Sequence, residues 1–332
     1  MIKAINVGNR NPQVVRPFTV PRTDYHFLVK EPRGYRINAD HDFLPDKNLA
    51  LHYVPFGEVA PKIVVLIHGL SHSLIHFDRL AAELARRYGI ECISLGLPGH
   101  YGDSKQYTES EFAQLTLEDY VSDVRAKLDA IANRYGRQLV VLGHSMGGLV
   151  TLQALTSPDL ATPVCPGVSG VILLSSAGTS DCGRIRRTPA MLGAVLANAV
   201  DLLAGKPLIM NEGIMRSSFF NGAISPAEFE WFIQTVQPEA NGATWQLIRA
   251  AFGPIVPRHY SPRIDLGTRS VLNMFAECDR LVAPATALEL AEKLKTRAGA
   301  ITTHPIKQAP HDSMITHPQE VARIISLHLD NL

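Results

Sequence analysis

Residues 138–155 read QLVVLGHSMGGLVTLQAL, and this stretch decides the fold. An apolar strand pattern leads into GHSMG at residues 143–147, and a helical pattern follows it. The spacing fits G-x-S-x-G, a motif whose serine sits on a sharp strand-to-helix turn with an unfavourable φ angle. Gly143 and Gly147 leave the space that such a turn needs. The motif therefore predicts that the Ser145 hydroxyl is lifted clear of a sheet, at the N-terminus of a helix.

The same alternation of strand and helix extends outward from this motif. Continuous apolar runs predict strands at residues 62–67, 90–95, 138–142, 170–175, 270–276 and 300–307. Helical spacing predicts helices at residues 74–88, 117–131, 146–157, 285–296 and 318–329. Strands without polar alternation are buried on both faces, and their alternation with helices implies parallel pairing with right-handed crossovers. The sequence thus predicts an α/β fold, a mostly parallel sheet with helices on both faces.

The alternation stops near Asp181, where the chain becomes helical and rich in large apolar side chains. We therefore divide the chain into a core of residues 1–182 and 259–332 and a helical cap of residues 183–258. Residues 1–60 form an N-terminal extension that includes antiparallel edge strands. Weaker strand signals at residues 25–29 and 49–54 support these edge strands.

The composition describes an ordinary globular protein. The chain of 332 residues is 46% hydrophobic and 19% charged, which suffices for a sizeable core. With 32 Lys and Arg against 31 Asp and Glu, no global field recruits nucleic acid or an acidic membrane. No apolar run reaches the ~18 residues of a membrane span, and residues 1–18 lack the apolar run of a signal peptide. The 4 cysteines show no C-x-x-C spacing, so we expect no zinc site and a cytoplasmic location.

A serine hydroxyl needs a base to become nucleophilic, and the base needs an orienting acid. In the chain order Ser…Asp…His, Asp279 follows the strand at 270–276 and His311 follows the last strand. Both lie at the carboxyl ends of strands, where active sites of open α/β sheets are found. We expect Ser145, Asp279 and His311 to form a catalytic triad. The alternatives are Asp181 or Glu277 as the acid, while His304 and His317 are expected to be structural.

An oxyanion hole needs two backbone N–H groups beside the nucleophile. We expect them from Met146, directly after Ser145, and from Leu70 in the loop after the first parallel strand. Four further histidines are expected to have supporting roles. His68 would stabilise the loop, His72 and His76 would be solvated or lie behind the site, and His144 would be a packing neighbour.

Five short motifs together resemble the α/β-hydrolase superfamily from about residue 50 to the end of the chain. They are His68-Gly69, Leu97-Pro98-Gly99-His100, Gly143-His144-Ser145-Met146-Gly147-Gly148, Cys278-Asp279 and Pro310-His311-Asp312. The pattern is most similar to capped esterases and monoacylglycerol-lipase-like serine hydrolases. This resemblance implies an eight-stranded sheet, a Ser-His-Asp triad, and no metal or organic cofactor. The sequence departs from the family at Gly96, where Asp is common, and in its N-terminal extension.

These observations predict a serine hydrolase that cleaves a carboxylic ester or thioester of an apolar acyl group through an acyl-enzyme. The expected partner is a small acyl substrate, without nucleic acid and without stable membrane insertion, and the sequence sets no oligomeric state. Acyl transfer or lyase chemistry on the same fold is the first alternative, and a non-catalytic ligand-binding module is the second. The fold alone does not separate these functions.

Overall fold

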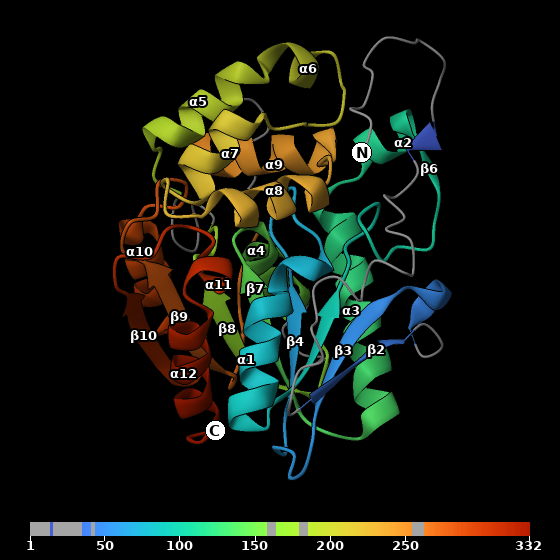
Figure 1. Ribbon diagram of the computed structural model, residues 1–332, viewed down its shortest axis with the longest axis vertical. Helices are drawn as coiled ribbons and strands as arrows, with labels where there is room; N and C mark the ends of the chain where they lie inside the picture. Colours follow the sequence, from blue (N-terminus) through green and yellow to red (C-terminus); the bar gives the residue numbers. More distant parts are fainter. Residues whose placement is uncertain (1–13, 16–34, 41–43, 158–163, 179–184, 254–261) are drawn as a thin grey trace.

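The computed structural model describes residues 14–15, 35–40, 44–157, 164–178, 185–253 and 262–332. Its centre is an eight-stranded sheet in the order β10-β9-β8-β7-β4-β5-β3-β2 (Figure 1). The strands are β2 (Tyr35–Asp40), β3 (Ala50–Pro55), β4 (Ile63–Ile67), β5 (Glu91–Leu95), β7 (Leu139–His144), β8 (Val168–Leu174), β9 (Ser270–Ala276) and β10 (Ile301–Ile306). All neighbours from β10 to β5 pair in parallel, whereas β3 and β2 are antiparallel. The predicted α/β sheet is confirmed.

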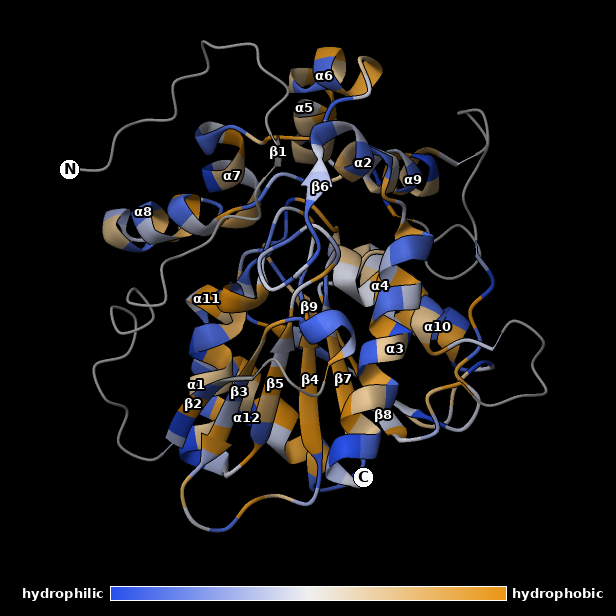
Figure 2. Ribbon diagram, turned by 90° about the vertical axis from the view of Figure 1, so that its right-hand side faces the viewer, coloured by the Kyte–Doolittle hydropathy of each residue, from blue (hydrophilic) through white to orange (hydrophobic). Residues whose placement is uncertain are grey.

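Helices cover both faces of this sheet, as Figure 2 shows with the apolar strands between them. One face carries α1 (Asp78–Tyr88), α11 (Ser313–Thr316) and α12 (Pro318–Leu329), and the other carries α3 (Leu117–Tyr135), α4 (Met146–Ala154) and α10 (Pro284–Leu294). Every residue of β4 and β5 is buried, which explains why their sequences show no polar alternation. Gly89 ends α1 at φ 63° and Gly136 ends α3 at φ 59°, a conformation that glycine adopts at little cost.

One predicted helix differs in the structure, and one predicted strand cannot be compared. The helix expected at residues 74–88 starts as a 3₁₀ turn, Leu74–Phe77, before α1 begins. The expected strand at residues 49–54 is β3, but the strand signal at residues 25–29 lies outside the described residues. Within the described residues, β2 forms the edge of the sheet, beside β3.

Small elements complete the core. The strand pair β1 (Val14–Val15) and β6 (Tyr107–Thr108) is antiparallel, and it is followed by α2 (Glu109–Gln114). A further 3₁₀ turn spans Pro45–Lys47.

In the described residues between β8 and β9, the chain forms five helices. They are α5 (Pro189–Ala197), α6 (Ala199–Leu203), α7 (Glu212–Phe219), α8 (Pro226–Thr235) and α9 (Asn241–Phe252). We call residues 185–253 the helical segment, and Figure 1 shows it above the carboxyl ends of the parallel strands. The predicted cap boundaries, residues 183 and 258, both fall outside the described residues. Within the described part of the chain, no helix is long and apolar enough to cross a membrane.

Candidate active site

Ser145 occupies the turn between β7 and α4, with φ 52° and ψ −121°. The motif predicts this strained conformation, and the glycines beside it make the turn possible. A Cβ on Gly143 would lie 2.5 Å from the carbonyl oxygen of Gly147, and one on Gly147 would lie 2.3 Å from that of His68. Ser145 itself is partly exposed and lines a pocket, whereas its neighbours in β7 and α4 are buried. Its side chain is therefore accessible to a ligand.

Backbone hydrogen bonds hold this turn against the end of β8. The Ser145 N–H donates to the carbonyl oxygen of Leu174 at 3.0 Å. The Ser145 carbonyl oxygen accepts from the N–H of Ala177 at 2.9 Å and from that of Gly148 at 3.0 Å. These bonds fix the strained residue between two strands of the sheet.

His311 and Asp279 meet from the loops that follow β10 and β9. The Nδ1–H of His311 donates to Oδ2 of Asp279 at 2.7 Å, and both side chains are 1% exposed. Among the described residues, the buried Nε2 of His311 has no hydrogen-bond partner. The ring of His311 lies 4.8 Å, between centroids, from that of His144, the residue before Ser145. The arrangement therefore offers one unpartnered imidazole nitrogen close to the serine turn.

The surroundings of His311 favour its protonated form. Burial lowers the pKa of its imidazole, but the charge of Asp279, the hydrogen bond to it and the charge of Asp312 outweigh burial, so the pKa lies above the ordinary 6.5. Burial dominates for His144, and with the charges of His311 and His72 it holds the His144 pKa well below 6.5. The surroundings therefore raise the imidazole pKa of His311 and lower that of His144.

Three of the four alternative acids and bases make contacts of their own in the structure. Glu277 is exposed and accepts a hydrogen bond from the backbone N–H of Gln308 at 3.2 Å. Asp181 lies outside the described residues. His304 lies in β10, and His317 precedes α12 with its Nδ1 2.8 Å from the Thr316 hydroxyl.

The residues expected to form the oxyanion hole line the same pocket as Ser145. Met146 begins α4, and the first N–H groups of a helix have no partner within the helix. Leu70 belongs to the loop after β4. We call residues 68–73 the β4 loop. Both main chains thus lie beside the serine turn.

His68 holds the β4 loop through both ring nitrogens. Its Nε2 accepts from the N–H of Leu97 at 3.1 Å, and its Nδ1–H donates to the carbonyl oxygen of Gly69 at 3.0 Å. Only a neutral imidazole makes both bonds, which agrees with a pKa that burial and the charge of His100 hold well below 6.5. His68 therefore acts as the sequence predicts, as a support of the loop.

A buried polar group that the sequence did not reveal lies behind the serine turn. Nε2 of His72 lies 2.9 Å from Oδ2 of Asp312, and Nε2 of His144 lies 3.6 Å from Oδ1 of the same carboxylate. His72 and His76 are both buried, so of the two expected roles the solvated one is excluded and a place behind the site fits. His72 and its partner Asp312 are 240 positions apart in the chain, so no local sequence pattern predicts their contact.

The same group contains the side chains that could hold a metal ion within the described part of the chain. His72, His144 and Asp312 each offer one ligand atom, and these atoms lie within 4.8 Å of one another. Here they contact each other directly, and Nε2 of His144 also lies 3.3 Å from the carbonyl oxygen of His311. The group thus connects the β4 loop to the loop that carries His311.

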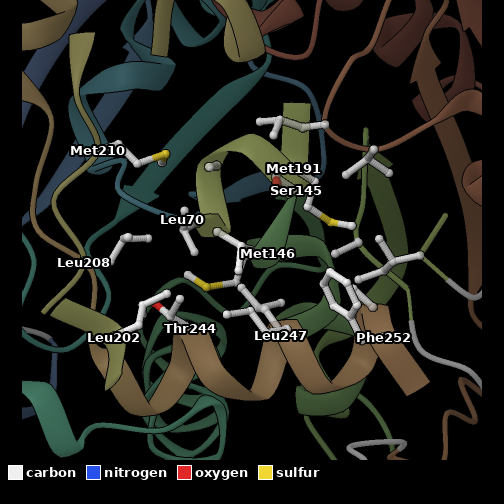
Figure 3. Close-up of a pocket in the computed structure, with 18 of the residues that line it drawn as sticks. Leu70, Ser145, Met146, Met191, Leu202, Leu208, Met210, Thr244, Leu247 and Phe252 are labelled. Atoms are coloured by element: carbon white, nitrogen blue, oxygen red, sulfur yellow. The ribbon is translucent and has the colours of Figure 1, made fainter. Parts of the chain in front are cut away.

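The pocket above Ser145 has a volume of about 130 Å³ and is almost entirely apolar. Its walls come from the β4 loop, α4, the helical segment and the loop after β9, and Figure 3 shows Leu247 and Phe252 of α9 projecting into the same space as Ser145. Among the described residues of the lining, one polar side chain accompanies Ser145: Thr244, whose hydroxyl donates to the carbonyl oxygen of Ala240 at 2.8 Å. The lining suits an apolar group that reaches the serine.

Helix α5 separates this pocket from solvent. Met191, Ala194 and Val195 face the pocket, yet the helix contains no fully buried residue. The outer surface of α5 and α6 carries large exposed apolar side chains, of which Leu196 is 74% exposed and Val200 81%. This wall of the pocket is therefore loosely packed.

Residues 64–324 match the Alpha/beta hydrolase family, and the chain belongs to this family. The match covers the serine turn and the loops with Asp279 and His311. Family membership supports a hydrolase activity.

Individual relatives are distant. An uncharacterized hydrolase of Bacillus subtilis (strain 168), YugF, is 27% identical over 129 residues, which are 39% of this chain and 41% of that protein. A lipase-esterase related protein from Clostridium acetobutylicum has a similar structure, with a TM-score of 0.58 and 19% identity over 84% of this chain and 98% of that one. The monoacylglycerol lipase of Paleococcus ferrophilus also gives a TM-score of 0.58 with 19% identity, over 85% of this chain and 98% of that one. At such identities the solved structures show a shared fold.

Proposed function

We propose that the protein is a serine hydrolase that cleaves a carboxylic ester or thioester of an apolar acyl group through an acyl-enzyme. The observation that carries this proposal is the buried His311–Asp279 pair. Among the described residues, Nε2 of His311 has no hydrogen-bond partner, and its ring lies 4.8 Å from that of His144, the residue before Ser145, which lines the pocket. A nucleophile, a base and an orienting acid are the groups that acyl transfer needs.

In the proposed reaction the Ser145 hydroxyl attacks the substrate carbonyl carbon while Nε2 of His311 takes up the hydroxyl proton. Asp279 holds the imidazole in the required tautomer and stabilises its charged form. The N–H groups of Leu70 and Met146 bind the oxyanion of the tetrahedral intermediate. The protonated His311 then gives its proton to the leaving alcohol or thiol, and an acyl-enzyme remains.

Water completes the cycle. His311 removes a proton from the water molecule, whose oxygen attacks the acyl carbon, and the proton returns to Ser145 as the acid leaves. The products are one carboxylic acid and one alcohol or thiol for each water consumed. The apolar lining supports an acyl chain as the group held above Ser145, since the described lining residues include no charged side chain to bind a polar one.

The test is intact-protein mass spectrometry after reaction with a fluorophosphonate, which labels activated serines. We expect one adduct on the wild type, none on Ser145→Ala, and one on Ser217→Ala, a control at an exposed serine of α7. A panel of p-nitrophenyl esters from acetate to palmitate then measures turnover and chain-length preference. A folded wild type without an adduct would contradict the proposal, and transfer of the acyl group to an alcohol in preference to water would indicate acyltransferase chemistry instead.

A further inference from the structure

Glu239, in the link between α8 and α9, is a fully buried carboxylate outside the proposed triad. Its Oε1 accepts from the Tyr120 hydroxyl at 2.6 Å and from the backbone N–H of Ala240 at 3.1 Å. Its Oε2 accepts from the backbone N–H of Ser71 at 2.9 Å and lies 3.3 Å from Nε2 of His100. Burying a carboxylate to this extent costs free energy unless the group is well hydrogen-bonded, and Glu239 is well hydrogen-bonded.

The partners keep Glu239 ionised. Burial raises the pKa of its carboxyl, but the charge of the nearby His100 and the hydrogen bonds from Tyr120 and Ser71 outweigh burial, so the pKa lies below its ordinary value of 4.5. Three of these partners belong to the core, whereas Glu239 belongs to the helical segment. The carboxylate therefore joins the two parts of the protein.

Hydrogen bonds from the link between α8 and α9 fix the peptide groups on both sides of Ser71. Ser71 has φ 61°, which is unfavourable for a residue with a side chain. Its N–H donates to Glu239, and its carbonyl oxygen accepts from the N–H of Gln237 at 2.9 Å. Such a conformation persists only where the surroundings determine it, and here the helical segment holds the residue from both sides.

Leu70 directly precedes Ser71, and its own peptide group is fixed as well. The carbonyl oxygen of Gly69 accepts from Nδ1–H of His68 at 3.0 Å and from the N–H of His72 at 3.2 Å. Because a trans peptide is planar, the N–H of Leu70 points the opposite way from that carbonyl. The carbonyl oxygen of Leu70 in turn lies 2.7 Å from Nδ1 of His72. The direction of the Leu70 N–H thus depends on the bonds that hold the β4 loop.

We propose that Glu239 is a positioning residue for the oxyanion hole, which holds the β4 loop so that the Leu70 N–H faces the developing oxyanion. This role rests on the proposed function, because it requires that Leu70 binds an oxyanion during acyl transfer. The oxyanion hole is then complete only when the helical segment is seated on the core. Glu239 acts through Ser71 and touches no substrate.

The test compares Glu239→Ala and Glu239→Gln with the wild type, using steady-state kinetics on a p-nitrophenyl ester. Loss of one oxyanion donor lowers kcat by about 10²-fold, and we expect Glu239→Ala to approach this loss with KM changed by less than about threefold. Glu239→Gln keeps a carbonyl oxygen that can accept from Ser71, so it should retain most of kcat. Tyr120→Phe is the matched control, since it removes another donor to the same carboxylate and leaves the Ser71 bond in place. Each rate is referred to the concentration of fluorophosphonate-titrated sites, so that unfolded protein does not count.

A second readout separates positioning from a purely structural role. The Ser145 hydroxyl adds to the carbonyl carbon of a trifluoromethyl ketone and forms a hemiketal oxyanion. The corresponding secondary alcohol has the same chain but no carbonyl group, so it forms no oxyanion. In both Glu239 variants the affinity for the ketone should fall by the same factor as kcat, and the affinity for the alcohol should not change. Wild-type kcat and ketone affinity in Glu239→Ala, or a decrease in melting temperature alone, would overturn the role of Glu239. If the wild type showed no turnover, or if its turnover persisted in Ser145→Ala, the proposed function would be overturned, and this role with it.

Discussion

Asp279 contacts His311 through one carboxylate oxygen only. Oδ2 accepts from His311 at 2.7 Å, while Oδ1 is occupied by the backbone N–H groups of Leu281 and Val282. The backbone bonds fix the carboxylate, and the carboxylate then fixes the imidazole with its proton on Nδ1. The consequence is that Nε2, on the far side of the ring, is the basic nitrogen.

Replacing Asp279 tests this dependence. Asp279→Asn preserves the shape of the side chain but removes its charge, and an amide at this position favours the wrong imidazole tautomer. In the Ser-His-Asp template this change lowers kcat by about 10⁴-fold, and we expect a comparable loss of ester hydrolysis here. Glu277→Gln is the control, because this exposed carboxylate lies two residues away and contacts Gln308 instead of His311. Equal activities of the two variants would remove Asp279 from the mechanism.

The pH dependence of activity should follow His311. The base must be neutral, so kcat/KM rises with pH through the pKa of His311 in the free enzyme. Since Asp279 and Asp312 raise that pKa over the effect of burial, the midpoint should lie above 6.5. The measurement is kcat/KM for an uncharged ester between about pH 5 and 9, the range in which a histidine near 6.5 titrates. A flat profile, or a midpoint below 6.5, would contradict this assignment.

The contribution of the His311–Asp279 pair to the free energy of unfolding should fall as pH rises, whereas activity should increase. A histidine whose pKa is higher in the folded state contributes stability below its unfolded pKa, and this contribution is lost as pH rises through the folded value. The His311–Asp279 pair should therefore stabilise the wild type more at pH 6 than at pH 8, in comparison with Asp279→Asn. Thermal unfolding of both proteins at these two pH values measures the difference.

Gly69 should not tolerate a side chain. A Cβ at this position would lie 2.9 Å from Cβ of Ser145 and 3.1 Å from Nδ1 of His144, so Gly69→Ala must displace either the serine turn or the β4 loop. We expect a loss of ester hydrolysis well beyond tenfold together with ~1–3 kcal/mol of destabilisation, the usual effect of overpacking. Kinetics and denaturant unfolding measure the two effects.

Gly193 provides the matched substitution. It lies in α5, and a Cβ there would meet no atom within 4 Å. Because alanine favours helices over glycine by about 0.8–1 kcal/mol, Gly193→Ala should keep its activity and gain slightly in stability. If Gly69→Ala were as active as Gly193→Ala, the close contact at the serine turn would have no bearing on catalysis.

The space in the pocket should limit the length of the acyl chain that the substrate can carry. Ala194 lines the pocket from α5, so Ala194→Trp fills part of it and should lower kcat/KM for long p-nitrophenyl esters by more than about tenfold, as expected when a bulky group no longer fits. Acetate hydrolysis should change little. Ala197→Trp is the control, since Ala197 is exposed on the same helix. A uniform effect across chain lengths would place the acyl group elsewhere.

Much of the fold follows from local sequence patterns. The run from Ile63 to Ile67 is apolar at every position because β4 is buried on both faces, and such runs reveal central strands directly. Edge strand β2 has no such run, since it reads YRINAD and has a single neighbouring strand, so the sequence did not reveal it. The 3₁₀ start before α1 was also missed, because its apolar spacing continues that of the helix.

The candidate site could be predicted only where a motif marks it. Ser145 lies in a motif, and Asp279 and His311 follow strands at the expected edge, so their places were predictable while their roles stay predictions. The contact of His72 with Asp312 spans 240 positions, and that of Ser71 with Glu239 spans 168. Such pairs depend on how the helical segment and the loops pack, which no local pattern records.

Two parts of the helical segment are held to the rest of the protein in different ways. The link between α8 and α9 is hydrogen-bonded to the β4 loop through Gln237 and Glu239, whereas α5 contributes no fully buried residue. Under the proposed role of Glu239, a substitution in this link alters the reaction itself, whereas a substitution in α5 alters the space above Ser145. Catalytic rate and substrate range are then set by separate parts of the helical segment.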